Sequence, residues 1–220
     1  MKYSKTFNGI YVIDIKGERL LLLPEKALLW EKRGILLLAD MHLGKVNHFR
    51  RSGIAVSSEP NNQNIDRFIN LLQRWKPERV LFMGDLFHSH YNAEWEVLGQ
   101  VLKYFPAISF ELIIGNHDIM SEYQYLKHQL ILHEEPLYIG PFSLSHETIE
   151  EEAYYNIAGH LHPGVRLTGK GRQALKLPCF YFGSQHGLLP AFGEFTGLAL
   201  VKPKKEDQIF VIINEQVLKV

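Results

Sequence analysis

The sequence has few of the features that mark secreted, zinc-finger or membrane proteins. A single cysteine, Cys179, cannot close an internal disulfide and leaves no set of thiolates for a zinc finger. The first nine residues lack the apolar core of a secretory signal, and apolar runs such as residues 35–39 are far too short to cross a bilayer. From these absences we expect a cytoplasmic protein with no membrane partner.

An excess of charge of one sign is also missing, because Lys plus Arg and Asp plus Glu both number 24. The net charge therefore gives no general attraction to nucleic acid or to an anionic membrane, and any basic surface must be local. The sequence has no internal repeat and no low-complexity linker. We expect one domain, residues 1–220, with a full hydrophobic core.

What the sequence does contain is a series of short apolar runs that end at Asp or Gly. Residues 35–39, 80–83 and 112–114 are continuous apolar runs, which is the pattern of strands buried on both faces. Apolar residues at helical spacing separate them, over residues 65–72 and 95–105. This strand–helix–strand order predicts a parallel sheet with functional residues at the carboxyl ends of its strands.

The second half of the sequence is rich in short strand-like runs and poor in helical periodicity. Near the N-terminus, residues 11–15 and 20–23 predict a hairpin over a turn at residues 16–18. We therefore expect an α/β architecture of two packed sheets with helices on the outside. The runs in the second half are residues 137–139, 142–145, 174–177, 180–182, 198–201 and 209–213.

Polar motifs follow these runs and supply two carboxylates, one carboxamide and four imidazoles. Such hard or borderline ligands suit Mn²⁺, Fe, Zn²⁺ or Mg²⁺. One carboxylate of the set, such as Asp85, can bridge two cations, and a two-metal centre is the usual apparatus for displacement at phosphorus. We therefore expect a phosphoesterase. The candidate ligands are Asp40, His42, Asp85, Asn116, His146, His160 and His162.

Each motif alone has an ordinary structural explanation. A strand-end Asp or Asn is more often a turn residue or a helix cap, and we expect isolated histidines such as His128 and His133 to be solvated. The interpretation rests on the motifs taken together. In residues 40–42 and 160–162 the i, i+2 spacing would project both outer side chains to the same side of an extended segment.

The motifs together resemble the signature of the calcineurin-like metallophosphoesterase superfamily. The resemblance implies a four-layer αββα sandwich, two central mixed β-sheets flanked by helices. It also implies two divalent metal ions, Mn²⁺ first and Fe, Zn²⁺ or Mg²⁺ as alternatives. The matching motifs are D-x-H at residues 40–42, G-D at 84–85, G-N-H-D at 115–118, His146, and G-H-x-H at 159–162.

The resemblance also implies a role for each residue. His117 would act as the general acid toward the leaving oxygen, and Asp118 would orient its imidazole. A hydroxide between the metals would be the nucleophile. The first metal would bind Asp40, His42, Asp85 and His162, and the second would bind Asp85, Asn116, His146 and His160.

Two flanking segments, residues 38–54 and 188–197, are similar to the bacterial ligase-associated DNA-damage-response metallophosphoesterases. This narrower resemblance implies a nuclease or phosphodiesterase that acts on DNA in repair, beside a DNA ligase and a helicase. The sequence departs from the commonest pattern at His88 and His90, which add two imidazoles after the second motif. His88 could support the ligands or be purely structural.

Basic residues follow the first and the last motif closely. Because Lys45, Arg50 and Arg51 come a few residues after the first ligands, we expect their charge to lie beside the metals and to bind substrate phosphate. A solvated turn is the alternative for the two arginines. The second basic stretch consists of Arg166, Lys170, Arg172 and Lys176.

Three classes of function fit these residues. The favoured class is a nuclease or phosphodiesterase acting on DNA. The second is an enzyme with the same metals and a small substrate, such as a cyclic nucleotide, a nucleotide-sugar diphosphate or a phosphomonoester. The third is a non-catalytic scaffold in a repair complex, which the presence of His117 argues against.

Overall fold

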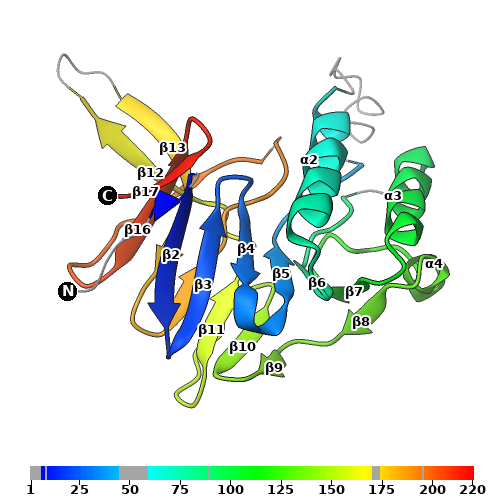
Figure 1. Ribbon diagram of the computed structural model, residues 1–220, viewed down its shortest axis with the longest axis horizontal. Coiled ribbons are helices and arrows are strands. Elements are labelled where there is room, and N and C mark those ends of the chain that lie inside the picture. Colours follow the sequence, from blue (N-terminus) through cyan, green and yellow to red (C-terminus); the bar gives the residue numbers. More distant parts are fainter. Residues whose placement is uncertain (1–5, 8, 45–58, 89, 170–173, 195) are drawn as a thin grey trace.

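Two mixed β-sheets pack face to face in the computed structural model, and helices lie against one of them (Figure 1). The structure describes residues 6–7, 9–44, 59–88, 90–169, 174–194 and 196–220. The first sheet has the strand order β1-β2-β3-β4-β5-β6-β7-β8. The second has the order β15-β12-β13-β14-β11-β10-β9, with β16 paired to β13 and β17 paired to β16. The α/β fold of two packed sheets expected from the sequence is confirmed.

The bounds of these elements are as follows. The first sheet contains β1 (Thr6–Phe7), β2 (Ile10–Ile15), β3 (Glu18–Leu23), β4 (Ala27–Trp30), β5 (Ile35–Leu38), β6 (Arg79–Met83), β7 (Ser109–Ile113) and β8 (Ile131–His133). The second contains β9 (Leu137–Ile139), β10 (Phe142–Ser145), β11 (Tyr155–Ala158), β12 (Pro163–Thr168), β13 (Ala174–Phe182), β14 (His186–Leu188), β15 (Ala199–Leu200), β16 (Gln208–Ile213) and β17 (Gln216–Lys219). The helices are η1 (Glu31–Arg33), α2 (Glu59–Trp75), α3 (Ala93–Tyr104) and α4 (Glu122–Lys127).

The three apolar runs of the first half form β5, β6 and β7, which pair in parallel. They are buried on both faces because alternate side chains meet different layers. In β5, Leu36 and Leu38 belong to the core beneath the helices, whereas Leu37 belongs to the core between the sheets. Parallel pairing brings the carboxyl ends of these strands to one edge of the sheet.

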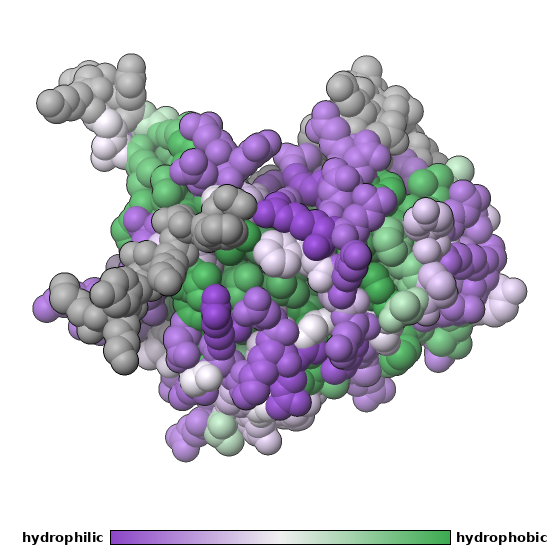
Figure 2. All heavy atoms as spheres, in the orientation of Figure 1, coloured by the Kyte–Doolittle hydropathy of each residue, from purple (hydrophilic) through white to green (hydrophobic). Residues whose placement is uncertain are grey.

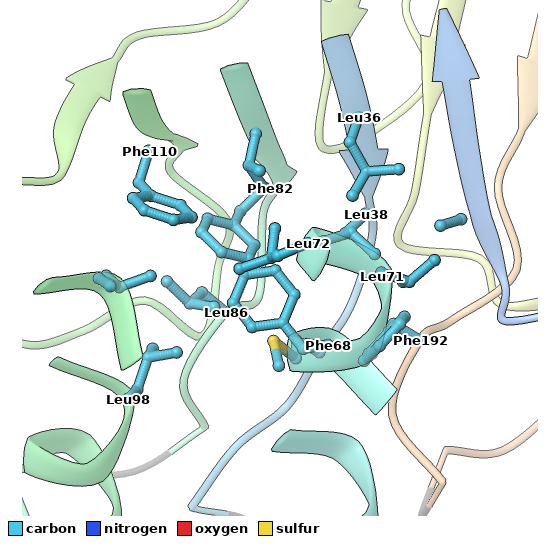
Figure 3. Packing of buried hydrophobic residues seen from close by; sticks show 14 of the residues in the cluster. Leu36, Leu38, Phe68, Leu71, Leu72, Phe82, Leu86, Leu98, Phe110 and Phe192 are labelled. Atoms are coloured by element: carbon cyan, nitrogen blue, oxygen red, sulfur yellow. The ribbon is translucent and has the colours of Figure 1, made fainter. Parts of the chain in front are cut away.

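Helices α2 and α3 cover the outer face of the first sheet at the positions that the helical spacing predicts. Phe68 and Leu72 of α2 pack against Phe82 of β6, as Figure 3 shows. The sequence did not indicate α4, which adds the buried Tyr125 to the same core. All three α-helices in the described part of the chain lie against the first sheet, so the expected layer of flanking helices is confirmed on that sheet, and none of the described helices covers the second. None of the described helices is long and apolar enough to span a membrane.

A second core fills the space between the sheets. Leu81 and Ile113 of the first sheet meet Leu144, Ile157 and Phe180 of the second. In the second sheet β10, β11 and β14 are parallel. Residues that follow β10 and β11 therefore also leave the sheet at the carboxyl ends of parallel strands.

The structure corrects the expectation that His128 and His133 are solvated. His128 is only 2% exposed and packs over Gly99 of α3, where an added Cβ would lie 2.2 Å from its ring. Burial lowers the pKa of His128. His133 places Nε2 2.6 Å from the Glu111 carboxylate. Periodicity could not reveal these environments, because both depend on neighbours distant in the sequence.

Candidate metal centre

The structure brings all seven candidate ligands to one place, at the carboxyl ends of five strands from both sheets. Each ligand segment begins one to three residues after a strand, following β5, β6, β7, β10 and β11. Chain segments more than a hundred residues apart are in contact here. One example is the Asp40 carboxylate, which accepts a hydrogen bond from the backbone amide of His160 at 2.9 Å.

One group of ligand atoms consists of Asp40, His42 and His162, whose ligand atoms lie within 4.8 Å of one another. His42 Nε2 lies 3.3 Å from His162 Nε2, and His162 Nε2 lies 3.4 Å from Asp40 Oδ1. Asp40 Oδ1 is buried and has no hydrogen-bond partner among the described residues. A bare carboxylate oxygen beside two imidazole nitrogens is the donor set that a divalent cation would satisfy.

The second group consists of Asp85, His146 and His160, also within 4.8 Å. His146 Nδ1 donates to the Met83 carbonyl at 3.0 Å, which fixes the tautomer and leaves the lone pair on Nε2. That Nε2 faces Asn116 Oδ1 at 3.0 Å, His160 Nδ1 at 3.0 Å and Asp85 Oδ1 at 3.5 Å. Several atoms whose lone pairs face one place are the arrangement expected around a bound cation.

Asp85 lies between the two groups and turns one oxygen toward each. Its Oδ2 is 3.8 Å from His42 Nε2 of the first group, and its Oδ1 is 3.5 Å from His146 Nε2 of the second. The carboxylate is therefore positioned as a bridge. Together, the residues fit two divalent cations side by side.

The backbone at these ligands adopts an unusual conformation. Residues in the left-handed region are strained unless they are glycine, and such strain concentrates at functional sites. The expectation that the i, i+2 pairs lie on extended segments is wrong, because the residues of both pairs adopt left-handed backbone conformations in loops instead. The φ angles are 52° at Asp40, 48° at His42, 51° at Asp85, 63° at His160 and 47° at His162.

The glycines of the motifs make room for the ligands of neighbouring motifs. A Cβ on Gly84 would lie 2.2 Å from the His146 ring, and one on Gly115 would lie 2.5 Å from Asp85 Oδ1. A Cβ on Gly159 would lie 2.8 Å from Asp40 Oδ2. Each glycine is thus required by the close approach of a ligand from another strand.

His117 lies at the rim of this cluster. Its ring centroid is 5.8 Å from that of His42 and 3.9 Å from that of His88, so His88 packs against the proposed general acid. The backbone amide of His117 donates to Asp85 Oδ1 at 2.9 Å. His90, by contrast, is exposed.

Asp118 does not make the contact expected of it. Its two oxygens accept hydrogen bonds from the backbone amides of Gly115 and Phe87, at 2.9 and 3.2 Å, and the described contacts include none with the His117 ring. Burial raises the pKa of the Asp118 carboxyl to about 7, while the two amide hydrogen bonds act in the opposite direction. The carboxylate ties the loop that carries His117 to the loop after β6, because one oxygen accepts from Gly115 and the other from Phe87.

The segment 191–194 supports the first motif, a role that the sequence did not reveal. Ala191 forms a parallel bridge with Ala39, and the amide of Gly193 donates to the Asp40 carbonyl at 3.1 Å. Arg67 of α2 holds this segment through the Phe192 carbonyl and the Glu194 carboxylate. The segment thereby fixes the backbone of the Asp40 loop.

The predicted phosphate-binding residues Lys45, Arg50 and Arg51 lie outside the described residues, as do Lys170 and Arg172. The other two members of the second basic stretch, Arg166 and Lys176, are exposed and stand opposite each other on β12 and β13.

Comparisons with known proteins agree with this geometry. The family model described as calcineurin-like phosphoesterase matches residues 34–212. The chain is similar to the solved nuclease MPE of Pseudomonas putida, at 30% identity over 96% of this chain and 100% of that chain, with a TM-score of 0.82. The search of curated proteins found no match.

Two further solved structures are similar to parts of the chain. The protein of unknown function AQ665 from Aquifex aeolicus has 18% identity and a TM-score of 0.43, over 63% of this chain and 82% of that chain. The phosphoesterase YfcE from E. coli has 12% identity and a TM-score of 0.44, over 84% of this chain and 97% of that chain.

Proposed function

The chain belongs to the calcineurin-like phosphoesterase family, and we propose that this metal-dependent phosphoesterase acts on DNA as a nuclease. The observation that carries the proposal is the pair of ligand groups joined by Asp85, whose two oxygens face different groups. Likeness over the full length to a protein that is itself a nuclease supports a nucleic acid as the substrate.

In the proposed site, the ligands divide as the resemblance implies. When bound, two cations would lower the pKa of a water held between them and neutralise charge on the phosphoryl oxygens. His117 donates a proton to the leaving oxygen from its place beside His42. Asp118 positions His117 through the loop backbone. One cation would be held by Asp40, His42, Asp85 and His162, and the other by Asp85, Asn116, His146 and His160.

The finer features of the function are part of the same proposal. The metal is Mn²⁺, the protein is a single cytoplasmic domain, and its partners in repair are a DNA ligase and a helicase. Support for the choice of metal comes from the ligand set, which contains imidazole, carboxylate and amide donors and no thiolate. Lys45, Arg50 and Arg51 bind phosphates that flank the scissile one.

A single comparison of substrates tests the proposal. Protein loaded with Mn²⁺ is assayed on labelled single-stranded, nicked and 3′-phosphate DNA, and on bis-p-nitrophenyl phosphate. We expect cleavage of DNA and of the small diester, and loss of both activities when the metal is removed by chelation and not replaced. Hydrolysis of the small diester with no attack on any DNA would overturn the nuclease proposal and favour a small natural substrate.

A further inference from the structure

The β12–β13 ribbon, residues 165–168 paired with 174–177, extends from the second sheet a few residues after the last metal ligand. Its first strand, β12, begins at Pro163, the residue after His162, which is the last of the seven ligands. Within the described parts of the chain, β13 pairs with β14 and β16 only from Cys179 onward, and β12 pairs with β15 only at Pro163 and Gly164, so residues 165–168 and 174–177 form a two-stranded ribbon. Figure 1 shows it projecting from the body of the sandwich at the upper left.

The direction of the ribbon follows from the pairing of the strands. β12 and β14 are both antiparallel to β13, and β14 is parallel to β11. β12 therefore runs in the same direction as β11, past the carboxyl edge at which His160 and His162 stand. The ribbon rises above the edge that carries the metal ligands, and in Figure 2 the outline of the molecule is indented between it and α2.

The two faces of the ribbon differ in chemistry. Residues directly opposite each other share a face, and successive residues alternate between faces. Arg166 opposes Lys176 on one face, whereas Leu167 opposes Leu175 on the other. The leucines remain 37% and 50% exposed, so neither face of the ribbon is covered there.

The basic face is the one that looks toward the first sheet. Phe180 and Phe182 of β13 pack in the core between the sheets. Lys176 differs from them by an even number of residues, so its side chain leaves β13 on the same face. The basic face therefore continues the face of β13 that lines the core between the sheets.

Two cations placed opposite each other repel, and such a pair is unfavourable in a sheet unless an anion relieves it. No carboxylate of the described residues forms an ion pair with Arg166 or Lys176. Both are exposed and available to a ligand. An arginine and a lysine side by side bind phosphate oxygens well.

We propose that the β12–β13 ribbon is a backbone-binding arm that holds the phosphates of a nucleic acid strand through Arg166 and Lys176 while the strand is cut at the metal centre. This proposal rests on the proposed function and names the part of the molecule that distinguishes a polymer from a small ester. Arg166 is four residues past His162, about 13 Å along a strand. A dinucleotide has a single phosphodiester, which the metal centre would hold, so it has no flanking phosphate for the arm.

The test compares the double variant Arg166→Gln, Lys176→Gln with a control that loses the same charge elsewhere. The control is Lys32→Gln, Lys103→Gln. Lys32 lies in η1, just before β5, and Lys103 lies in the last turn of α3, and both are exposed at the opposite edge of the first sheet. The Mn²⁺-loaded proteins are assayed on a long single-stranded oligodeoxynucleotide, a dinucleotide and bis-p-nitrophenyl phosphate. KM is measured as a function of salt, because KM follows the dissociation constant when chemistry is slow.

The arm variant should raise KM for the long strand and leave the dinucleotide and the small diester within about twofold of the unaltered protein. Loss of two phosphate contacts lowers the salt slope by about 1.4 on a single strand, so between 0.05 and 0.2 M salt the unaltered protein should lose about sevenfold more affinity than the variant. A second variant, Leu167→Thr, Leu175→Thr, alters only the opposite face and should match the unaltered protein.

The outcomes separate the two proposals. If the unaltered protein cuts DNA and the arm variant behaves like the lysine control, the arm is refuted and the nuclease proposal stands. If the leucine variant, and not the cation variant, weakens binding of the long strand, the assignment of faces is refuted. If the unaltered protein cuts no DNA and binds none, both proposals fall together.

Discussion

The contact between Gly193 and the Asp40 loop allows a sharp test of how the site is positioned. An added Cβ at Gly193 would lie 2.7 Å from the backbone carbonyl oxygen of Met41 and 3.2 Å from that of Asp40. Because these are backbone atoms, no side chain can rotate away to relieve the overlap. The variant Gly193→Ala must therefore move the loop that carries Asp40 and His42.

The size of the effect follows from the overlap. Restoring an ordinary contact of about 3.4 Å requires a displacement of about 0.7 Å, and a misplacement of about 1 Å at a catalytic site costs about a hundredfold in rate. We expect a loss of about 10- to 100-fold in kcat/KM on bis-p-nitrophenyl phosphate and weaker binding of metal. Overpacking also costs about 1–3 kcal/mol of folding free energy, or about 2–12 °C in Tm for a chain of this size.

A glycine a few residues farther along the chain offers a matched control. A Cβ at Gly197 meets nothing within 4 Å, so Gly197→Ala should keep full metal content, rate and Tm. Metal per chain is measured by elemental analysis after equilibration at limiting Mn²⁺, and rates are measured well below the Tm of the weaker variant. If Gly193→Ala retains the metal content and the rate of Gly197→Ala, the segment 191–194 does not position the Asp40 loop.

Three further predictions address other parts of the molecule. Asp85→Asn should abolish turnover and lower metal content, because a neutral amide cannot offset repulsion between two cations; two metals per chain at undiminished rate would refute the bridge. His117→Ala should keep both metals and lose at least about a hundredfold in rate on substrates with poor leaving groups, with a smaller loss on p-nitrophenyl esters, whose leaving group needs no proton. Arg79→Met should destabilise the fold by about 3 kcal/mol in chemical denaturation, because the buried Glu111 carboxylate would lose the guanidinium bonds at 2.6 and 2.9 Å, whereas an unchanged midpoint would show that the pair contributes little. Burial would raise the pKa of Glu111, but Arg79 and His133 hold it below its usual value of 4.5, so this stability should be present at neutral pH and lost in acid as the pH falls below that value.

Periodicity predicted the elements that are buried on both faces or amphipathic. The apolar runs that became β5, β6 and β7 needed no tertiary information, because their neighbours in the sheet follow one another along the chain. It was less successful where an element depends on distant partners. The predicted runs 174–177 and 180–182 are one strand, β13, because Pro178 sits opposite Gly164 and the pairing continues through it.

The sequence predicted which residues make up the site but not the backbone conformation that positions them. The motifs named seven side chains that the structure brings together, since strand-end residues of parallel strands share an edge. The left-handed backbone conformation at Asp40 and His42 could not be predicted from the sequence, because neither residue type requires it. The role of Gly193 was equally invisible, because a glycine in a loop has many explanations until the neighbouring carbonyl is located.

The ligand groups draw on both sheets, and this links metal binding to folding. Asp40 and His42 follow a strand of the first sheet, whereas His162 leaves the second, so the first group exists only when the sheets are packed together. A cation bound there favours the packed state over every partly unfolded one, by about 2.7 kcal/mol at a hundredfold excess over its dissociation constant. Bound ions would thus hold the two halves of the chain at their shared edge as well as supply the proposed chemistry. Depletion of metal should weaken the packing between the two sheets before it destabilises either sheet alone.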